Sequence, residues 1–80
     1  MAELWRRADA PWEEIAGHVV VLHNKSLHRL EGLSAVIWQI TDEPAREDDL
    51  FAVLEMGGAE RETTAATIAE LADLGLLQSP

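Results

Sequence analysis

The sequence predicts an α+β fold in which a three-stranded antiparallel sheet packs against three helices. A run of apolar, largely β-branched residues at 18–23 has the composition of a strand and is too short for a helix. A polar turn at residues 24–26 interrupts it, and residues 27–30 resume the strand pattern, which together predict a hairpin. Apolar side chains at helical spacing occur from residue 33 onward, so helices cover the sheet.

The first strand of the meander is expected at residues 12–16, where large apolar residues alternate imperfectly with acidic ones. Gly17 separates it from the valine run, so three strands succeed one another over about residues 12–30. Residues 4–8 are expected to form an extended N-terminal piece that pairs weakly at a sheet edge and that ends before Pro11. Three strands with a packed helix suffice for independent stability, whereas a lone hairpin does not.

The first helix is expected over Ala35–Ile40, with Ser34 as its N-cap. Leu33, Ile37 and Ile40 lie on one helical face, and Trp38 beside them is expected to fill the core. Pro44 ends this helix, because it lacks a backbone donor and disfavours helical geometry in the residue before it.

A second helix begins at the acidic residues 47–49, which suit the free amides of a helix N-terminus. Its buried side chains are expected to be Leu50, Phe51, Val53 and Leu54, and Gly57-Gly58 stops it.

A third helix restarts near Glu60, with Thr64, Ile68, Leu71 and Gly75 on one stripe. Gly75 is the expected terminator, Leu76-Leu77 fold back onto the helix, and residues 78–80 form a tail. The whole chain, residues 1–80, is therefore expected to form one domain, with strands at about 12–30 and helices at about 33–77.

Composition excludes several classes of protein. The 80 residues contain no cysteine, so neither disulfides nor thiolate chemistry is available, which favours a reducing cytoplasm. No apolar run reaches the ~20 residues of a membrane span, and no secretory signal is visible. The sequence has no phosphate-binding glycine loop and no nucleophile elbow, so we expect a binding module without catalytic residues or cofactor rather than an enzyme.

The formal net charge is −9, from six basic and fifteen acidic side chains. DNA binding depends on a basic surface that neutralises phosphates, so this charge argues against nucleic acid as a partner. The field of the domain instead favours a neutral or basic partner, with an association rate that falls in salt.

Three histidines, His18, His23 and His28, raise the question of a metal site. His18 and His23 bracket one strand and point to opposite faces, so only one of them can meet His28 across the hairpin. We expect exposed strand-end histidines and no bound metal. The acidic residues at 42–49 lack the glycine turn of a calcium loop and are expected to be a solvated helix N-terminus.

Several stretches in a fixed order carry a resemblance to a known family. They are the run Val19–Leu22, the hairpin after it, the junction LEGLSAVIW at residues 30–38 and the closing ELADLGLL at residues 70–77. Together these resemble the PqqD-like family of peptide-recognition domains, which serve pathways of ribosomally made, post-translationally modified peptides. The resemblance covers nearly the whole chain and includes pyrroloquinoline-quinone proteins and the leader-binding proteins of lasso-peptide pathways.

The resemblance implies a winged helix-turn-helix-like domain that binds the leader segment of a precursor peptide. In the family, the leader adds a strand to the third strand of the sheet and lays side chains into the groove beside the third helix. The implied strand-edge residues here are Ser26, Leu27, His28, Arg29 and Leu30. The implied groove residues are Thr64, Thr67, Ile68 and Leu71.

The resemblance also implies a second partner, a separate modifying enzyme or leader peptidase of the same pathway. This chain departs from the family at Leu27 and His28, where aromatic residues are frequent, and at Glu31, where asparagine is frequent. Two other functions remain open from the residues: a winged-helix nucleic-acid-binding domain, which the charge disfavours, and a small domain whose open edge strand pairs with a second copy.

Overall fold

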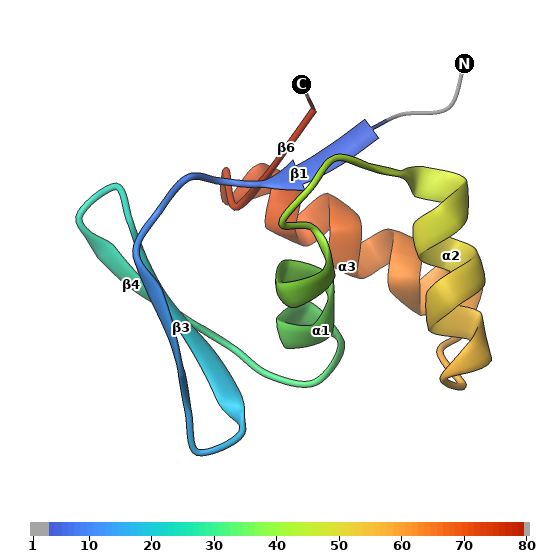
Figure 1. Cartoon of the computed structure of the whole chain (residues 1–80), viewed down its shortest axis with the longest axis horizontal. Coiled ribbons are helices and arrows are strands. Elements are labelled where there is room, and N and C mark those ends of the chain that lie inside the picture. The colour runs from blue at the N-terminus through green and yellow to red at the C-terminus, as the bar shows by residue number, and fades with distance from the viewer. Residues whose placement is uncertain (1–3, 80) are drawn as a thin grey trace.

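The fold is given by a computed structural model that describes residues 4–79. In chain order the elements are β1 (Leu4–Arg7), β2 (Trp12–Ile15), β3 (His18–His23), β4 (Ser26–Leu30), α1 (Leu33–Ile40), β5 (Ala45–Arg46), α2 (Glu47–Met56), α3 (Arg61–Asp73) and β6 (Leu77–Gln78). The predicted α+β class with three helices is confirmed, but the strands form two three-stranded antiparallel sheets instead of one. Figure 1 shows the meander on one side of α1 and helix α2 on the other.

The predicted meander is present, with strand order β2-β3-β4. Val19 and Val21 point inward and are fully buried, opposite Leu30 and His28 of β4. The alternate residues of β3, Val20 and Leu22, therefore point to the outer face of the sheet. Both connections are two residues long and have positive φ at both positions, the geometry of the turns that match strand twist.

The second sheet, in the order β5-β1-β6, was not predicted. The N-terminal strand does pair, as expected, but with segments from the middle and the end of the chain rather than with the meander. Two backbone hydrogen bonds continue this pairing: the Arg7 amide donates to the Thr41 carbonyl at 3.0 Å, and the Ala8 amide donates to the Leu76 carbonyl at 2.8 Å. The prediction of a tail from residue 78 is wrong at Gln78, which lies in β6, whereas residue 80 falls outside the described part.

Helix α1 begins two residues earlier than an N-cap at Ser34 requires. Gly32 occupies the cap position with φ of 57°, no side chain caps the helix, and Ser34 lies in the first turn. The Val36 amide donates to the Gly32 carbonyl at 3.2 Å. The positive φ explains why glycine rather than serine stands at the cap.

Helix α2 has the predicted acidic first turn and ends at Met56, before the two glycines. Leu50, Phe51 and Leu54 are buried as predicted. Val53 was expected to be buried with them, but its side chain is 54% exposed. The reason is that α1 and α2 each pack mainly against α3 and leave space between themselves.

Helix α3 ends in a Schellman motif, as Gly75 and the leucines after it predicted. Gly75 has φ of 77°, the Leu76 amide donates to the Leu71 carbonyl at 2.9 Å, and the Gly75 amide donates to the Ala72 carbonyl at 3.0 Å. Leu76 and Leu71 are both buried, which supplies the hydrophobic contact typical of this motif.

A single cluster of buried side chains joins the inner face of the meander to the helices. Trp38 is completely buried at its centre, so its predicted core role is confirmed. Trp12 meets it edge to face, with ring centroids 6.3 Å apart. The Arg7 guanidinium lies over both rings, 4.9 Å from the Trp12 centroid and 5.6 Å from that of Trp38, and fastens β1 to the core.

No helix within residues 4–79 is long and apolar enough to cross a membrane.

Candidate peptide-binding edge

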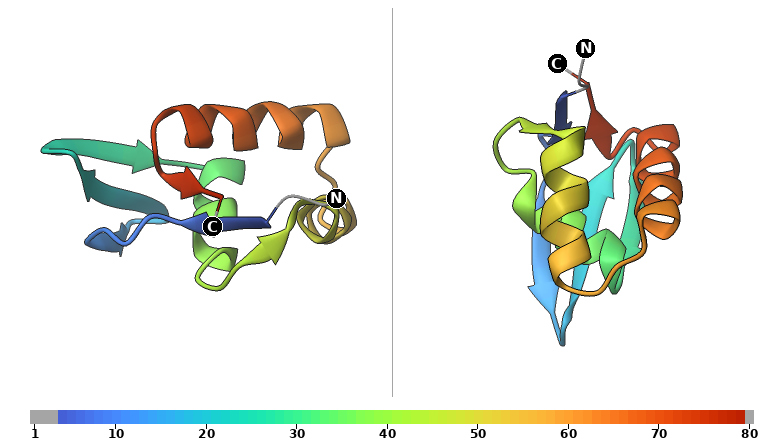
Figure 2. Two further views of the ribbon diagram at one scale, coloured as in Figure 1. Left: turned by 90° about the horizontal axis from the view of Figure 1, so that it is seen from above. Right: turned by 90° about the vertical axis from the view of Figure 1, so that its right-hand side faces the viewer.

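Strand β4 has one unpaired edge. It pairs with β3 from Ser26 to Leu30, and no other strand within residues 4–79 pairs with its far side. Both views of Figure 2 place this edge on the side of the molecule where α3 lies. An unpaired edge offers amides and carbonyls at ladder spacing, which an extended peptide can meet with its own backbone.

The opposite edge of the meander, on β2, is less suited to accept a strand. Pro11 precedes β2, and Glu13 and Glu14 give it two adjacent negative charges. The Gln39 side-chain amide donates to the Glu14 carboxylate at 3.1 Å and ties the strand to α1. Strand β4, Ser26–Leu30, contains neither a proline nor an acidic side chain.

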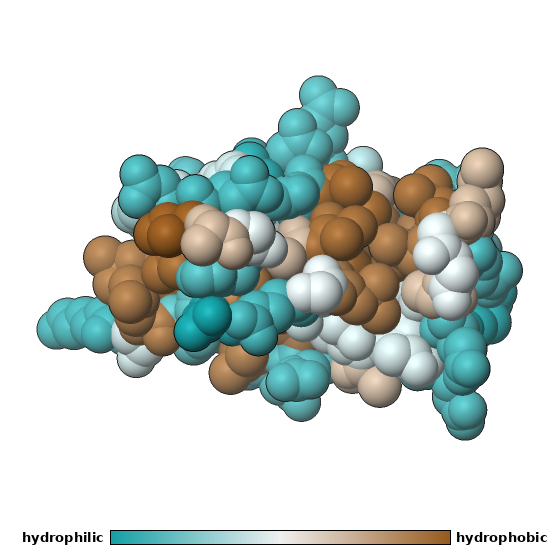
Figure 3. Space-filling model, turned by 90° about the horizontal axis from the view of Figure 1, so that it is seen from below, coloured by the Kyte–Doolittle hydropathy of each residue, from teal (hydrophilic) through white to brown (hydrophobic). Residues whose placement is uncertain are grey.

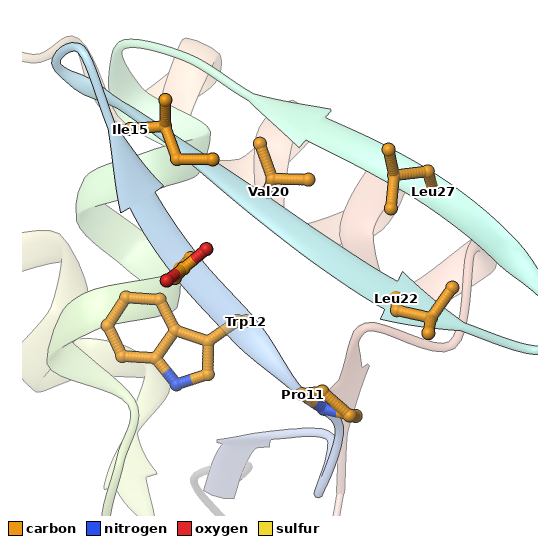
Figure 4. Close-up of a pocket in the computed structure, with 7 residues that line it drawn as sticks. Pro11, Trp12, Ile15, Val20, Leu22 and Leu27 are labelled. Carbon is orange, nitrogen blue, oxygen red and sulfur yellow. The ribbon is translucent and has the colours of Figure 1, made fainter.

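The outer face of the meander carries exposed apolar side chains. Leu22 and Leu27 are opposite one another across β3 and β4, and Leu27 is 72% exposed. With Ile15 and Val20 they form what we call the outer-face patch, which borders a shallow hollow of about 340 Å³ (Figure 4). Because Leu27 belongs to the edge strand, a peptide strand added to β4 would place its outward side chains beside this patch.

On the inner face, the meander meets the end of α3. A Cβ atom at Gly75 would lie 3.1 Å from Nε2 of His23, so the end of β3 rests against the Schellman turn. His28 lies next to His23 with ring centroids 6.5 Å apart. The β4 edge and the C-terminal end of α3 are thereby held in a fixed relation.

The four predicted groove residues of α3 differ in accessibility. Thr64, Ile68 and Leu71 are buried in the core, and Thr67 is partly exposed. The Thr67 hydroxyl donates to the Thr63 carbonyl at 2.8 Å, so its donor is already used within the helix. An open groove lined by all four is therefore not present in this structure, and peptide contact at these positions stays a prediction.

The five predicted edge residues all lie in β4. Ser26, Leu27 and Arg29 are exposed, His28 is partly buried, and Leu30 is buried in the core. The Arg29 guanidinium pairs with the Glu31 carboxylate at 2.8 Å, but both groups are about two-thirds exposed, so the pair stabilises the strand little.

Within residues 4–79, no group of three or more histidine, cysteine or acidic side chains comes together in a way that would hold a metal ion. Of the two histidine pairings that the hairpin allowed, His18 with His28 or His23 with His28, the structure shows the second.

Sequence reasoning did not identify three members of the outer-face patch, Ile15, Val20 and Leu22, as site residues. For Val20 and Leu22 the signal was the alternation of side chains along β3, which turns them away from the buried Val19 and Val21. Alternation alone leaves open whether a second layer covers the outer face, and this structure places none there among the described residues.

No protein-family model matches this chain, and no curated protein and no solved structure matches it significantly.

Proposed function

We propose that this chain is a non-catalytic peptide-binding module of the PqqD-like kind. It captures the leader of a ribosomally made precursor peptide by strand addition to β4 and presents the precursor, in the cytoplasm, to a separate modifying enzyme or leader peptidase. The observation that carries the proposal is the unpaired β4 edge beside the exposed Leu22 and Leu27.

In strand addition, backbone hydrogen bonds supply affinity and side-chain contacts supply specificity. Backbone pairing along the five residues of β4 is nearly indifferent to sequence, whereas side chains on the peptide alternate between the outer-face patch and the side of α3. A disordered leader loses roughly 2–5 kcal/mol in becoming ordered, so apolar anchors must offset that cost. Outward apolar side chains next to Leu27 are the anchors that this surface offers.

The same edge favours one second candidate, pairing of β4 with β4 of another copy. Exposed Leu22 and Leu27 would be covered in such a dimer. Each copy carries a formal charge of −9, and the repulsion between two copies opposes formation of this dimer. Light scattering at micromolar concentration separates the two candidates, since the leader-binding module is a monomer before its peptide is added.

The proposal is tested by a proton–nitrogen NMR titration with synthetic leaders of precursors encoded beside this chain. Shifts are expected along Ser26–Leu30, in the outer-face patch and at Thr67. A leader with N-methyl groups at the amides that face β4 must lose binding, while methylation of the alternate amides leaves it unchanged. Equal binding of both methylated peptides would exclude strand addition.

Leu27→Ser is expected to weaken leader binding about tenfold, the effect of losing roughly 1.4 kcal/mol of apolar contact. Because Leu27 is 72% exposed, its removal leaves the stability of the free domain nearly unchanged. Isothermal titration calorimetry measures the affinity, and thermal unfolding checks the fold. Met56→Ser, on the far helix α2 and 90% exposed, is the matched control with unchanged affinity. Equal affinities for the two variants would remove Leu27 from the site.

A further inference from the structure

A second apolar surface lies between α1 and α2, on the side of α1 that faces away from the meander (Figure 1). The two helices each pack against α3 and leave a hollow of about 430 Å³ between them. Leu33 and Val36 line it from α1, Val53 and Leu54 line it from α2, and residues 57–59 close one end. We call this the α1–α2 groove. Figure 3, which views the molecule from the side where α1 begins, shows hydrophobic surface at the centre of this face.

The groove exposes branched aliphatic side chains that the core does not use. Val36 is 43% exposed and Val53 is 54% exposed, although their neighbours Ile37 and Leu54 on the same helices are buried in the core. The lining contains no charged side chain, and its residues offer no polar side-chain group to orient a small polar ligand. Such a surface suits apolar side chains presented at helical spacing.

Charge is distributed very unevenly along the chain. Residues 42–73, which include α2 and α3, carry ten acidic and two basic side chains, a net charge of −8. Residues 4–31, which include the meander, carry four of each and are neutral. One of the two basic residues of segment 42–73, Arg61, is already engaged: its guanidinium lies 3.9 Å from the Asp48 carboxylate, 3.6 Å from the Glu55 carboxylate and over the Phe51 ring.

Unpaired carboxylates border the apolar lining. Asp49 is one helical turn before Val53, and Glu60 comes directly after Ala59 of the lining. Neither carboxylate forms a salt bridge within residues 4–79. A ligand that fills the groove therefore meets an apolar floor and an acidic border.

We propose that the α1–α2 groove docks an amphipathic helix of another protein, with aliphatic side chains on one face and lysine or arginine on the other. Helix α2 has ten residues and is about 15 Å long, which accommodates about three turns of a docked helix with anchors at i, i+3 or i+4, and i+7. A second copy of this chain fits poorly, because it would bring a further formal net charge of −9 to the acidic border of the groove. No residue of β4 lines the groove, so this inference does not depend on the proposed function.

The test uses two synthetic amphipathic peptides of about five helical turns, one of leucine and lysine and one of leucine and glutamate in the same pattern. An NMR titration of the labelled domain with the lysine peptide is expected to shift amides of Leu33, Val36 and Val53 and of residues 57–59. The glutamate peptide is expected not to bind. Val53→Ser and Val36→Ser should each lower the affinity for the lysine peptide about tenfold, and neither substitution changes the charge of the domain.

Leu74→Ser is the matched control, because Leu74 is a comparably exposed leucine outside the groove, and it should leave the affinity unchanged. Equal affinities for Val53→Ser and the parent would mean that the lysine peptide is held by charge alone, and would overturn the proposal. So would a dimer of the free domain that Val53→Ser dissociates, because a second copy would then be the occupant. Leu27→Ser separates the two sites: it should weaken leader binding and leave binding of the lysine peptide intact.

Discussion

Two buried threonines differ in how their hydroxyl groups are satisfied. The Thr41 hydroxyl, just after α1, donates to the Ile37 carbonyl at 2.7 Å. The Thr64 hydroxyl in α3 is equally buried but has no hydrogen-bond partner within the described part of the chain. A buried polar group without a partner carries its full desolvation cost, so the two side chains contribute to stability with opposite sign.

Thr64→Val is expected to stabilise the domain by about 1 kcal/mol, because it replaces an unpaired hydroxyl with a methyl group of similar size. Thr41→Val is expected to destabilise it by a similar amount, about 1 kcal/mol, through loss of a made hydrogen bond. Urea denaturation of both variants measures the two changes in the free energy of unfolding. A loss of stability in Thr64→Val would mean that the hydroxyl has a partner after all.

Burial also decides which residues can be used to probe binding. Ile68 was predicted to line a peptide groove, yet only 2% of its surface is accessible. A charge at this position would unfold the core before it reported on a ligand. Helical periodicity placed Ile68 and Leu71 correctly on one stripe, but a stripe looks the same whether a ligand or the domain's own core covers it.

At the scale of single elements, the end of α3 depends on a glycine in two ways. Gly75 has φ of 77°, which a residue with a Cβ adopts at a cost of about 1–2 kcal/mol. A Cβ there would also press against the His23 ring at 3.1 Å. The glycine therefore terminates the helix and makes room for the meander.

Gly75→Ala is expected to destabilise the domain by about 1–2 kcal/mol or slightly more. Gly57→Ala is the control, because Gly57 has φ of −86° and its added Cβ would make only an ordinary contact, 3.5 Å from the Leu54 carbonyl oxygen. Thermal unfolding of both variants compares them directly. Equal melting temperatures would show that the turn tolerates a side chain.

The elements that the sequence pattern predicted well are those whose signals are local. Strands β2 to β4 and the three helices are predicted by alternation, helical spacing and the glycines and proline between them. Strands β5 and β6 are only two residues long, so no periodicity can mark them, and their pairing exists only because the tertiary fold brings them to β1. Val53 was misplaced for a related reason, since helical spacing does not say how far apart two helices lie.

At the scale of the whole molecule, the charge is concentrated in one half. The helical residues 42–73 carry a net charge of −8, and this self-repulsion opposes compaction. Raising the ionic strength from about 10 mM to about 0.15 M shortens the Debye length from about 30 Å to about 8 Å. We expect the melting temperature to rise over this range.

The same charge offers a control for that experiment. Asp73 lies in the last turn of α3, where a negative charge is unfavourable by about 0.3–1 kcal/mol. Asp73→Asn should raise the melting temperature at low salt. It should also make the rise in melting temperature on adding salt smaller than in the unchanged protein. If the melting temperature of both proteins is independent of salt concentration, charge repulsion in the acidic half does not destabilise the fold.

The candidate site also contains one part that could be predicted from the sequence and another that depends on the tertiary fold. The edge residues of β4 were predicted through the family resemblance, and their place on an edge strand follows from the order of strands in a meander. The outer-face patch and the α1–α2 groove were not, since each depends on the absence of a covering layer. Only the assembled fold reveals which apolar side chains are left over.

The pairing of Arg6 in β1 with Gln78 in β6 has a consequence for how the chain folds. The meander closes through two-residue turns, whereas the β1–β6 ladder joins segments far apart in the sequence, and closing so long a loop costs more entropy. The hairpins are therefore early events and the second sheet is a late one. During synthesis, β1 leaves the ribosome well before β6, so the ladder on this edge of β1 cannot form until the last strand has emerged.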